Sequence, residues 1–250
     1  RTAMAVQNMK PFYKTVICDT ETPITLYAKM ARPHSYAFLF ESGLQHEAVG
    51  RYSFIGFDPL MLHTFAEGGE KNPFEVLRQA FSTIDYTAAP ELPRLQAGFV
   101  GYFAYEAARH IEHIALPTGG TGIPEAVFYF PKNLLVFDHF NRTLTLIAYS
   151  EKDLEALLEE FNEKTLAFYP AALGSTLKSQ KRAQDADNQN KLQNNFKKSV
   201  DRAHKALKSG EAFQIVVSQL FTRKTDAEAF DIYRNLRIGA PCPYMYFLQY

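Results

Sequence analysis

Two separate segments of the sequence carry side chains that suit the binding of a small zwitterion. In the segment Phe38–Ser42, FLFES, an apolar run ends in an adjacent carboxylate and hydroxyl. Glu41 and Ser42 can accept hydrogen bonds from an ammonium group, and Arg51, nine residues after Ser42, offers a planar fork to a carboxylate. A structural reading is also open, in which Arg51 pairs with Glu41 or with another surface acid.

The second segment is Ala240–Met245, APCPYM, near the end of the sequence. Its two prolines fix the backbone, and Tyr244 and Met245 supply an aromatic ring and an adaptable thioether. Such a segment could contribute to a binding site. The alternative is that the prolines only make a rigid turn.

A third segment, Gly210–Gln219, GEAFQIVVSQ, has an apolar centre flanked by glutamines. The β-branched run Phe213–Phe221 predicts a strand, and strand alternation puts Gln214, Val216 and Ser218 on one face. Gln214 is therefore a candidate residue of an active-site strand.

Signals for metals and for nucleic acids are weak. His110 and His113 lie near Glu106 and Glu112, but no third ligand follows at a diagnostic spacing, and we expect an exposed polar helix end. The stretch 178–208 holds nine Lys/Arg and three Asp, a local net charge of +6. Its only aromatic residue is Phe196, so a solvated face is favoured over a stacking platform for nucleic acid.

Composition places the chain among globular proteins. Of its 250 residues, 46% are hydrophobic and 22% charged, and the formal net charge is zero, without the basic excess of a polyanion binder. Two cysteines, Cys18 and Cys242, suit a reducing compartment. There is no apolar run of about 18 residues and no signal-peptide core near the N-terminus. We expect a cytoplasmic protein that does not bind membranes.

Short strands dominate the first two thirds of the chain. The ranges 24–31 and 36–41 predict two strands, or a helix followed by a strand. Further strands are expected at 51–57, 98–105, 127–130, 133–138 and 143–149, the last two joined by a hairpin turn at 139–142 that Asn141 favours. Ser150 then caps a helix with apolar residues at Leu154, Leu157, Leu158 and Phe161. This pattern indicates the α+β class, with helices on the outside of a β-rich sandwich.

The chain divides into three parts by composition. Residues 1–170 form the β-rich first part, residues 171–195 a polar linker, and residues 196–250 the start of a second β-rich part. In that last part we expect a helix over 196–207 ended by Gly210, a helix over 230–237 and a strand over 244–250. A chain that stops inside an apolar strand suggests a fragment whose next strand is missing. The strands 213–221 and 244–250 would then pair with each other or with a neighbouring molecule.

Taken together, these motifs resemble the large subunit of the anthranilate synthase family. The matching segments follow the family's order: FLFES at 38–42, GRYSFIG at 50–56, GFVGYFAYE at 98–106, GEAFQIVVSQ at 210–219 and PCPYM at 241–245. Five ordered motifs across nearly the whole chain make the resemblance specific. Family members are about twice as long, so the chain resembles the N-terminal regulatory part and the opening of the chorismate-binding part.

The resemblance implies a reaction and its partners. The family converts chorismate and ammonia into anthranilate and pyruvate with Mg²⁺, and a glutamine amidotransferase subunit supplies the ammonia. Tryptophan inhibits at the interface of the two parts. The Mg²⁺ ligands and most chorismate contacts are expected beyond residue 250, so the fragment alone is expected to be inactive and to hold no metal.

The resemblance also assigns site residues. Glu41 and Ser42 match the first wall of the tryptophan site, Pro243, Tyr244 and Met245 match its second wall, and Arg51 is a looser match to a basic residue. Ala240 and Cys242 replace the family's usual Asn and Ser, which removes the polar contacts of those two side chains.

Two alternatives stay open. Component I of aminodeoxychorismate synthase tends to show Pro-Phe-Ser and Gln-Val-Asn-Leu where this chain has 243–245 and 214–217, so anthranilate synthase is favoured. The water-using isochorismate and salicylate synthases resemble this chain but carry a lysine at the position of Gln214. Glutamine cannot act as a general base for water, so this chain is expected to use ammonia. The second open alternative is that the isolated fragment acts only as an amino-acid-binding module, without catalysis.

Overall fold

The computed structural model describes residues 7–42, 50–114, 122–166, 186–219, 221 and 224–250. The chain divides into two compact units, one made of residues 1–170 with 232–250 and the other of residues 171–231. The sequence grouped 232–250 with 196–231, whereas in the structure the last segment joins the first unit. The cause is the antiparallel pairing of residues 245–249 with residues 37–41 of the first unit. Of the linker expected at 171–195, residues 171–185 lie outside the described residues. The remainder, from Ala186 onward, is helical and not an extended linker.

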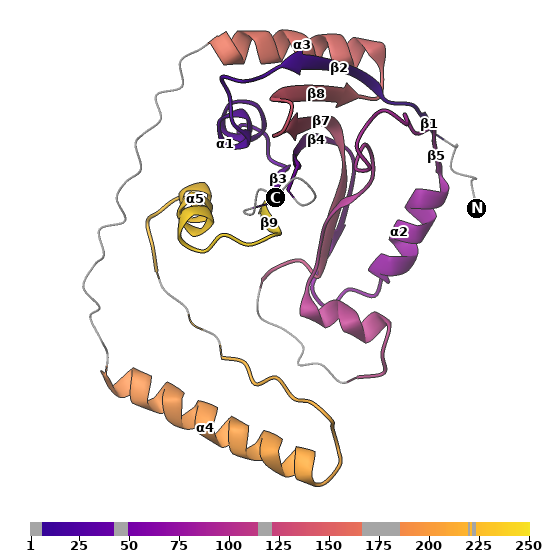
Figure 1. Ribbon diagram of the computed structural model, residues 1–250. Helices are drawn as coiled ribbons and strands as arrows, with labels where there is room; N and C mark the ends of the chain where they lie inside the picture. Colours follow the sequence, from indigo (N-terminus) through magenta and orange to yellow (C-terminus); the bar gives the residue numbers. More distant parts are fainter. Residues whose placement is uncertain (1–6, 43–49, 115–121, 167–185, 220, 222–223) are drawn as a thin grey trace. The chain divides into compact units, whose positions relative to one another are not determined.

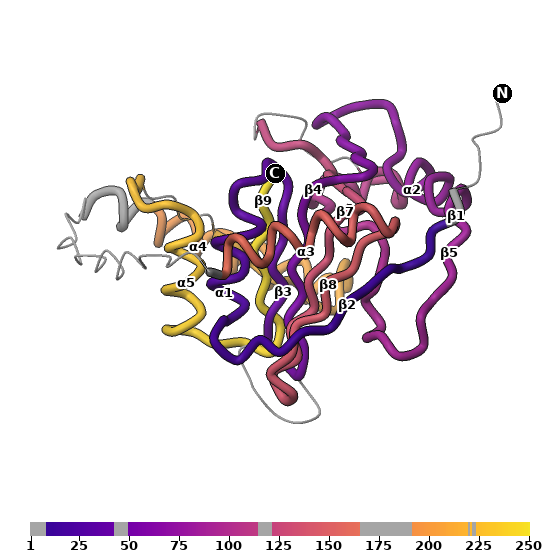
Figure 2. Tube along the Cα trace, turned by 90° about the horizontal axis from the view of Figure 1, so that it is seen from above, coloured from indigo at the N-terminus to yellow at the C-terminus, as the bar shows by residue number. Residues whose placement is uncertain are grey.

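The first unit is built on an antiparallel sheet (Figures 1 and 2). Its strands, in spatial order, are β2 (Phe12–Ile17), β8 (Thr143–Ala148), β7 (Ala126–Asp138), β4 (Tyr52–Phe65), β3 (Ala37–Glu41) and β9 (Met245–Gln249). A further strand, β6 (Val100–Phe103), pairs with β7, and β1 (Gln7–Met9) and β5 (Ile84–Tyr86) form a small parallel pair. The α+β class is confirmed.

The sheet centre is formed by two long strands. The ranges 127–130 and 133–138, predicted as separate strands, are one strand, β7, which pairs with β4 along its length. Pro59 faces Pro131 at a register shift where Asp58 has a φ of 59°. Because neither proline has an N–H to donate, the ladder is interrupted there without ending either strand.

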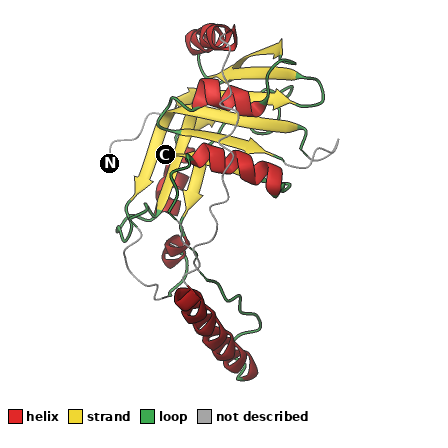
Figure 3. Ribbon diagram, turned by 90° about the vertical axis from the view of Figure 1, so that its left-hand side faces the viewer, coloured by secondary structure: helices red, strands yellow, loops and turns green. Residues whose placement is uncertain are grey.

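Helices flank the sheet (Figure 3). They are α1 (Pro23–Leu26), which continues as a π-helical turn over Tyr27–Ala31, α2 (Pro73–Ser82), α3 (Glu151–Leu166) and α5 (Ala229–Gly239), with a 3-10 turn at Tyr105–His110. The predicted cap of α3 is confirmed, because the backbone N–H of Asp153 donates to the Ser150 hydroxyl at 3.1 Å. The sequence prediction omitted α2, although Asn72 accepts from two backbone N–H groups and Pro73 opens the helix.

Strand alternation divides the core into two faces. On one face, Leu39, Ile55, Leu135 and Leu146 are register partners on successive strands and are fully buried. Phe247 of β9 lies on this face, opposite Leu39, and its ring contacts Tyr27 and Tyr233. Helix α5 therefore packs on this face. The other face carries a cluster of buried side chains: Phe38, Val100, Tyr129, Leu134, Val136 and Ile147.

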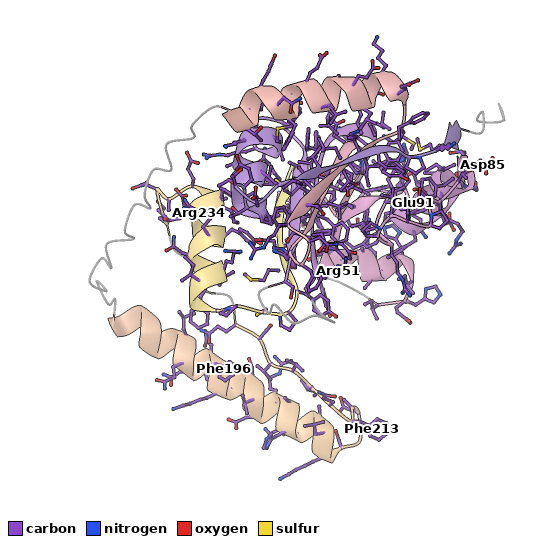
Figure 4. All side chains as sticks on the ribbon, turned by 45° about the horizontal axis from the view of Figure 1, so that its top comes forward. Arg51, Asp85, Glu91, Phe196, Phe213 and Arg234 are labelled. Atoms are coloured by element: carbon purple, nitrogen blue, oxygen red, sulfur yellow. The ribbon has the colours of Figure 1, made fainter. Side chains whose placement is uncertain are left out.

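The second unit contains helix α4 (Ala186–Lys208), and Gly210 follows it with a φ of 80°. The helix ends before Gly210 as predicted, but it begins ten residues earlier than the expected start at Phe196, within the stretch predicted as a linker. The strand predicted at Phe213–Phe221 is wrong, because residues 213–219 belong to no helix or strand. A β-branched run forms a strand only when a partner strand supplies the ladder, and β9 pairs with β3 instead. The side chains of Phe213, which Figure 4 labels, and of Val216 are exposed.

Among the described helices, none is both long and apolar enough to cross a bilayer. Cys18 is buried and Cys242 is exposed, and neither forms a disulfide.

Candidate functional site

Two segments that are about 200 residues apart meet at one end of the sheet. Strands β3 and β9 pair in an antiparallel ladder whose last register partners are Glu41 and Met245. The carboxylate–hydroxyl pair at 41–42 and the stiff turn at 243–245 are therefore direct neighbours, as Figure 1 shows for the strands that carry them. The structure thus brings together the two halves of the predicted binding site.

A cavity of about 400 Å³ opens at this junction. Its lining comes from the ends of β3 and β9, the start of β4 and one loop: Phe40, Glu41, Ser42, Gly50, Tyr52, Phe54, Leu95, Pro243, Tyr244, Met245 and Tyr246. Of the six residues that the resemblance assigns to a tryptophan site, all except Arg51 are in this set. The volume is at the small end of the range for ligand pockets, which suits a molecule the size of one amino acid.

One wall of the cavity is aromatic. Phe40 is the register partner of both Phe54 and Tyr246, so these three rings lie on the same face of the sheet. Phe40, Tyr52 and Phe54 also pack against the buried cluster around Phe38. The cavity is therefore an extension of the hydrophobic core and offers a planar apolar slot with hydroxyl groups at its edge.

The side chain of Glu41 lies on the opposite face of the sheet from that of Phe40, because the two residues are consecutive in β3. Its side chain is 2% exposed, and its Oε2 accepts from the Tyr233 hydroxyl at 2.7 Å and lies 3.1 Å from Arg237 Nε. Its Oε1 is buried and has no hydrogen-bond partner among the described residues. An ionised carboxylate oxygen that is buried without a donor is costly, so a ligand N–H placed there would gain a strong hydrogen bond.

The phenol of Tyr233 is a donor in this cluster. Burial, followed by the nearby charge of Glu41 and the hydrogen bond to it, raises the pKa of Tyr233 well above its ordinary value. The phenol therefore stays protonated across the physiological range and donates to Glu41.

Arg51 does not line the cavity. Its Nη2 lies 2.7 Å from Asp138 Oδ2, its Nε donates to the same carboxylate at 3.2 Å, and its side chain is 41% exposed. The guanidinium also lies 4.9 Å from the centre of the Tyr52 ring. The reading in which Arg51 pairs with another acid of its own chain is the one that the structure shows. The physical reason is that Asp138, the last residue of β7, is the register partner of Tyr52 at the start of β4, directly after Arg51.

Asp138 has a second role at the β7–β8 hairpin. Its Oδ1 accepts from the backbone N–H groups of Phe140 and Asn141 at 2.9 Å and 3.1 Å. Burial alone would raise the pKa of Asp138, but the hydrogen bonds from Arg51, Asn141 and Phe140 outweigh it and hold that pKa below its ordinary value. The predicted hairpin turn is thus confirmed, with Asp138 as the residue that organises it.

This arrangement predicts a pH dependence of stability. A carboxyl whose pKa is lower in the folded state stabilises the fold above its unfolded pKa and loses that effect as the pH falls through the folded pKa. Asp138→Asn is expected to lower the urea midpoint at about pH 6 and to differ less from the wild type at about pH 3. Asp85→Asn, at an exposed position of β5, is the matched control and should match the wild type throughout. A midpoint difference for Asp138→Asn that is independent of pH would contradict this role.

Gln214 is exposed in the second unit and lies outside any strand. Four residues that line the cavity were missed in the sequence analysis, namely Tyr52, Phe54, Leu95 and Tyr246. Tyr233 and Arg237, which contact Glu41, were also missed. Alternation along 52–56 and 244–250 could have indicated the aromatic wall. Nothing in the sequence indicated the two helical residues, since a contact between a helix and a distant strand leaves no local pattern.

Metal ligands do not gather in the described part of the chain, where no group of three or more His, Cys, Asp or Glu side chains could hold an ion. His110 is not the exposed helix end that we expected: its side chain is 11% exposed, and its Nε2 lies 2.7 Å from Glu125 Oε1. The described residues thus do not fit a resident Mg²⁺.

Comparison with known proteins gives a consistent relationship. Residues 21–250 match the model of the chorismate binding enzyme family. The chain is 34% identical to anthranilate synthase component 1 of Streptomyces coelicolor, over 96% of this chain and 48% of that protein. It is 30% identical to the Acetivibrio thermocellus protein of the same name, over 97% of this chain and 54% of that protein.

A solved structure supports the fold. The crystal structure of anthranilate synthase component I from Streptococcus pneumoniae superposes with a TM-score of 0.60 at 21% identity, over 89% of this chain and 52% of that one. The chain spans about half the length of the curated relatives it matches. Since the family model covers most of the sequence, the chain belongs to the chorismate binding enzyme family.

Proposed function

We propose that this chain is the regulatory half, with the opening of the chorismate-binding half, of an anthranilate synthase large subunit. The full-length enzyme would convert chorismate and ammonia into anthranilate and pyruvate, with ammonia delivered from glutamine by an amidotransferase subunit. Tryptophan would inhibit by binding in the cavity at the ends of β3 and β9. The similarity to anthranilate synthase component 1 proteins supports the reaction.

The observation that carries the inhibitor site is the joint construction of one cavity from residues 40–42 and 243–246. A free aromatic amino acid needs an acceptor for its ammonium, donors for its carboxylate and an apolar slot for its ring. Glu41 supplies the acceptor, the hydroxyls of Ser42 and Tyr244 supply donors, and the wall around Phe40 supplies the slot. Since Arg51 is held by Asp138, we assign it to support of the Tyr52 wall.

Replacing Ser42 by alanine tests this site in the full-length enzyme. Loss of one hydrogen bond to a charged group is expected to raise the tryptophan concentration for half inhibition by about tenfold or more. The KM for chorismate should stay unchanged, because Ser42 would contact the effector only. Ser82→Ala, on the exposed surface of α2, is the control. Tryptophan sensitivity that is unchanged in Ser42→Ala would count against the assignment.

The nucleophile is expected to be ammonia. Gln214 has no titratable group, so it cannot remove a proton from water as a lysine with a lowered pKa can. Mg²⁺ would neutralise carboxylate charge when bound, and we place its ligands in the part of the full-length enzyme outside these 250 residues.

The nucleophile is tested by the product formed from chorismate and an ammonium salt without the amidotransferase. The full-length enzyme is expected to give ortho-aminobenzoate, identified by chromatography against both aminobenzoate isomers. Para-aminobenzoate would support the aminodeoxychorismate synthase alternative. Addition of water as the main reaction would refute the role assigned to Gln214.

A further inference from the structure

The carboxylate of Glu41 is held from behind by one turn of helix α5. Tyr233 and Arg237, four residues apart and so on the same side of α5, both contact Oε2, whereas Oε1 of the same carboxylate has no partner among the described residues. Tyr233 is itself fixed, since it is 5% exposed and its ring packs on Phe247 of β9 at 5.5 Å. The carboxylate thus has one oxygen with two partners and one buried oxygen without a hydrogen-bond partner.

We propose that Tyr233 and Arg237 are positioning residues that set the specificity of the cavity for a ligand with a primary ammonium group. The proposal rests on the proposed function, because it concerns the same effector site. The two α5 residues fix the carboxylate plane through Oε2 and leave Oε1 as the acceptor at the junction of β3 and β9. They touch Glu41 and not the ligand.

The charge balance around Glu41 supports this division of roles. Arg237 compensates the buried carboxylate and its side chain is 34% exposed, so Glu41 tolerates burial without a ligand. Tyr233 adds a neutral donor that fixes direction without adding charge. A ligand ammonium at Oε1 would then share the carboxylate with Arg237, and it would gain a charge-assisted hydrogen bond that a ligand without the ammonium cannot make.

Specificity is measured with two probes that differ only at the ammonium. L-Tryptophan and indole-3-propionate share ring and carboxylate, and calorimetric titration of the chain with each gives a ratio of affinities. The wild type is expected to prefer tryptophan by about tenfold or more. In Tyr233→Phe this preference should fall to less than about threefold, chiefly through weaker tryptophan binding. Affinity for indole-3-propionate should not change.

Tyr27→Phe is the matched control. Tyr27 is another buried phenol, and its hydroxyl donates to Gln249 of β9 at 2.9 Å. This variant should keep the wild-type preference. If Tyr233→Phe does not fold, as judged by circular dichroism, Arg237→Met and Arg237→Lys decide. The preference should be lost in the first and partly restored in the second.

The failures can be told apart. A wild-type chain that binds neither probe would overturn the proposed effector site and this inference with it. A wild type that prefers tryptophan, with the same preference in a folded Tyr233→Phe or in Arg237→Met, would overturn the positioning role alone.

Discussion

Alanine at Gly101 is expected to lower the free energy of unfolding by about 3 kcal/mol. A Cβ at this position would lie 1.9 Å from the backbone oxygen of Val127 and 2.8 Å from Phe128 Cα. Both are backbone atoms of β7, the strand that pairs with β4, β6 and β8, so neither can move without breaking a ladder. Since no side-chain rotation relieves the clash, β6 must separate from β7.

Urea unfolding followed by circular dichroism measures this effect. Gly239→Ala is the control, because a Cβ there would meet nothing within 4 Å and the residue does not have a positive φ. We expect the control to stay within about 0.5 kcal/mol of the wild type. A Gly101→Ala protein as stable as the control would show that β6 does not approach β7 as closely as the structure has it.

Replacing Glu41 by alanine is expected to weaken tryptophan binding by more than about tenfold and to destabilise the chain by about 2 kcal/mol. The binding loss follows from removal of the ammonium acceptor. The stability loss follows because the Tyr233 hydroxyl loses its acceptor in a buried site and Arg237 loses its counter-charge, although that side chain is 34% exposed and partly solvated.

Glu41→Gln separates charge from packing. It keeps the shape of the side chain and an acceptor for Tyr233, so it should recover most of the stability and little of the tryptophan affinity. Both quantities are accessible from calorimetric titration and urea unfolding of the same preparations. If Glu41→Gln binds tryptophan as tightly as the wild type, the carboxylate is not the ammonium acceptor.

Much of the fold followed from local pattern. The run 143–149, the Ser150 cap and the glycine after 208 each identify an element through its own residues, and all three are confirmed. The division of β7 at Pro131 was wrong, because a proline that faces a second proline across a bulge does not end a strand. That relation joins residues 72 positions apart and has no local trace.

The site was predictable where its residues have a distinctive order. Glu41 with Ser42 and Pro243 with Met245 could be found from motifs, and their adjacency is the β3–β9 register. Arg51 was the exception. Its charge suggested that it binds the carboxylate of a ligand, but in the structure it forms an ion pair with Asp138. Which partner a long cationic side chain takes depends on tertiary neighbours, which the sequence does not display.

The strand expected at 213–221 failed for a related reason. Phe213 and Val216 have high β-propensity and are nonetheless exposed, since propensity describes the fit of a side chain to a paired, half-buried surface. The terminal strand found its partner in β3, which the sequence prediction did not foresee.

The proposed function requires that the cavity at the ends of β3 and β9 holds an aromatic amino acid. A crystal structure of this chain grown with saturating L-tryptophan would show the ligand in place. We expect density for the indole against Phe40, Phe54 and Tyr246, with the ammonium next to Glu41. Indole density bound elsewhere, or an empty junction at saturating ligand, would contradict it.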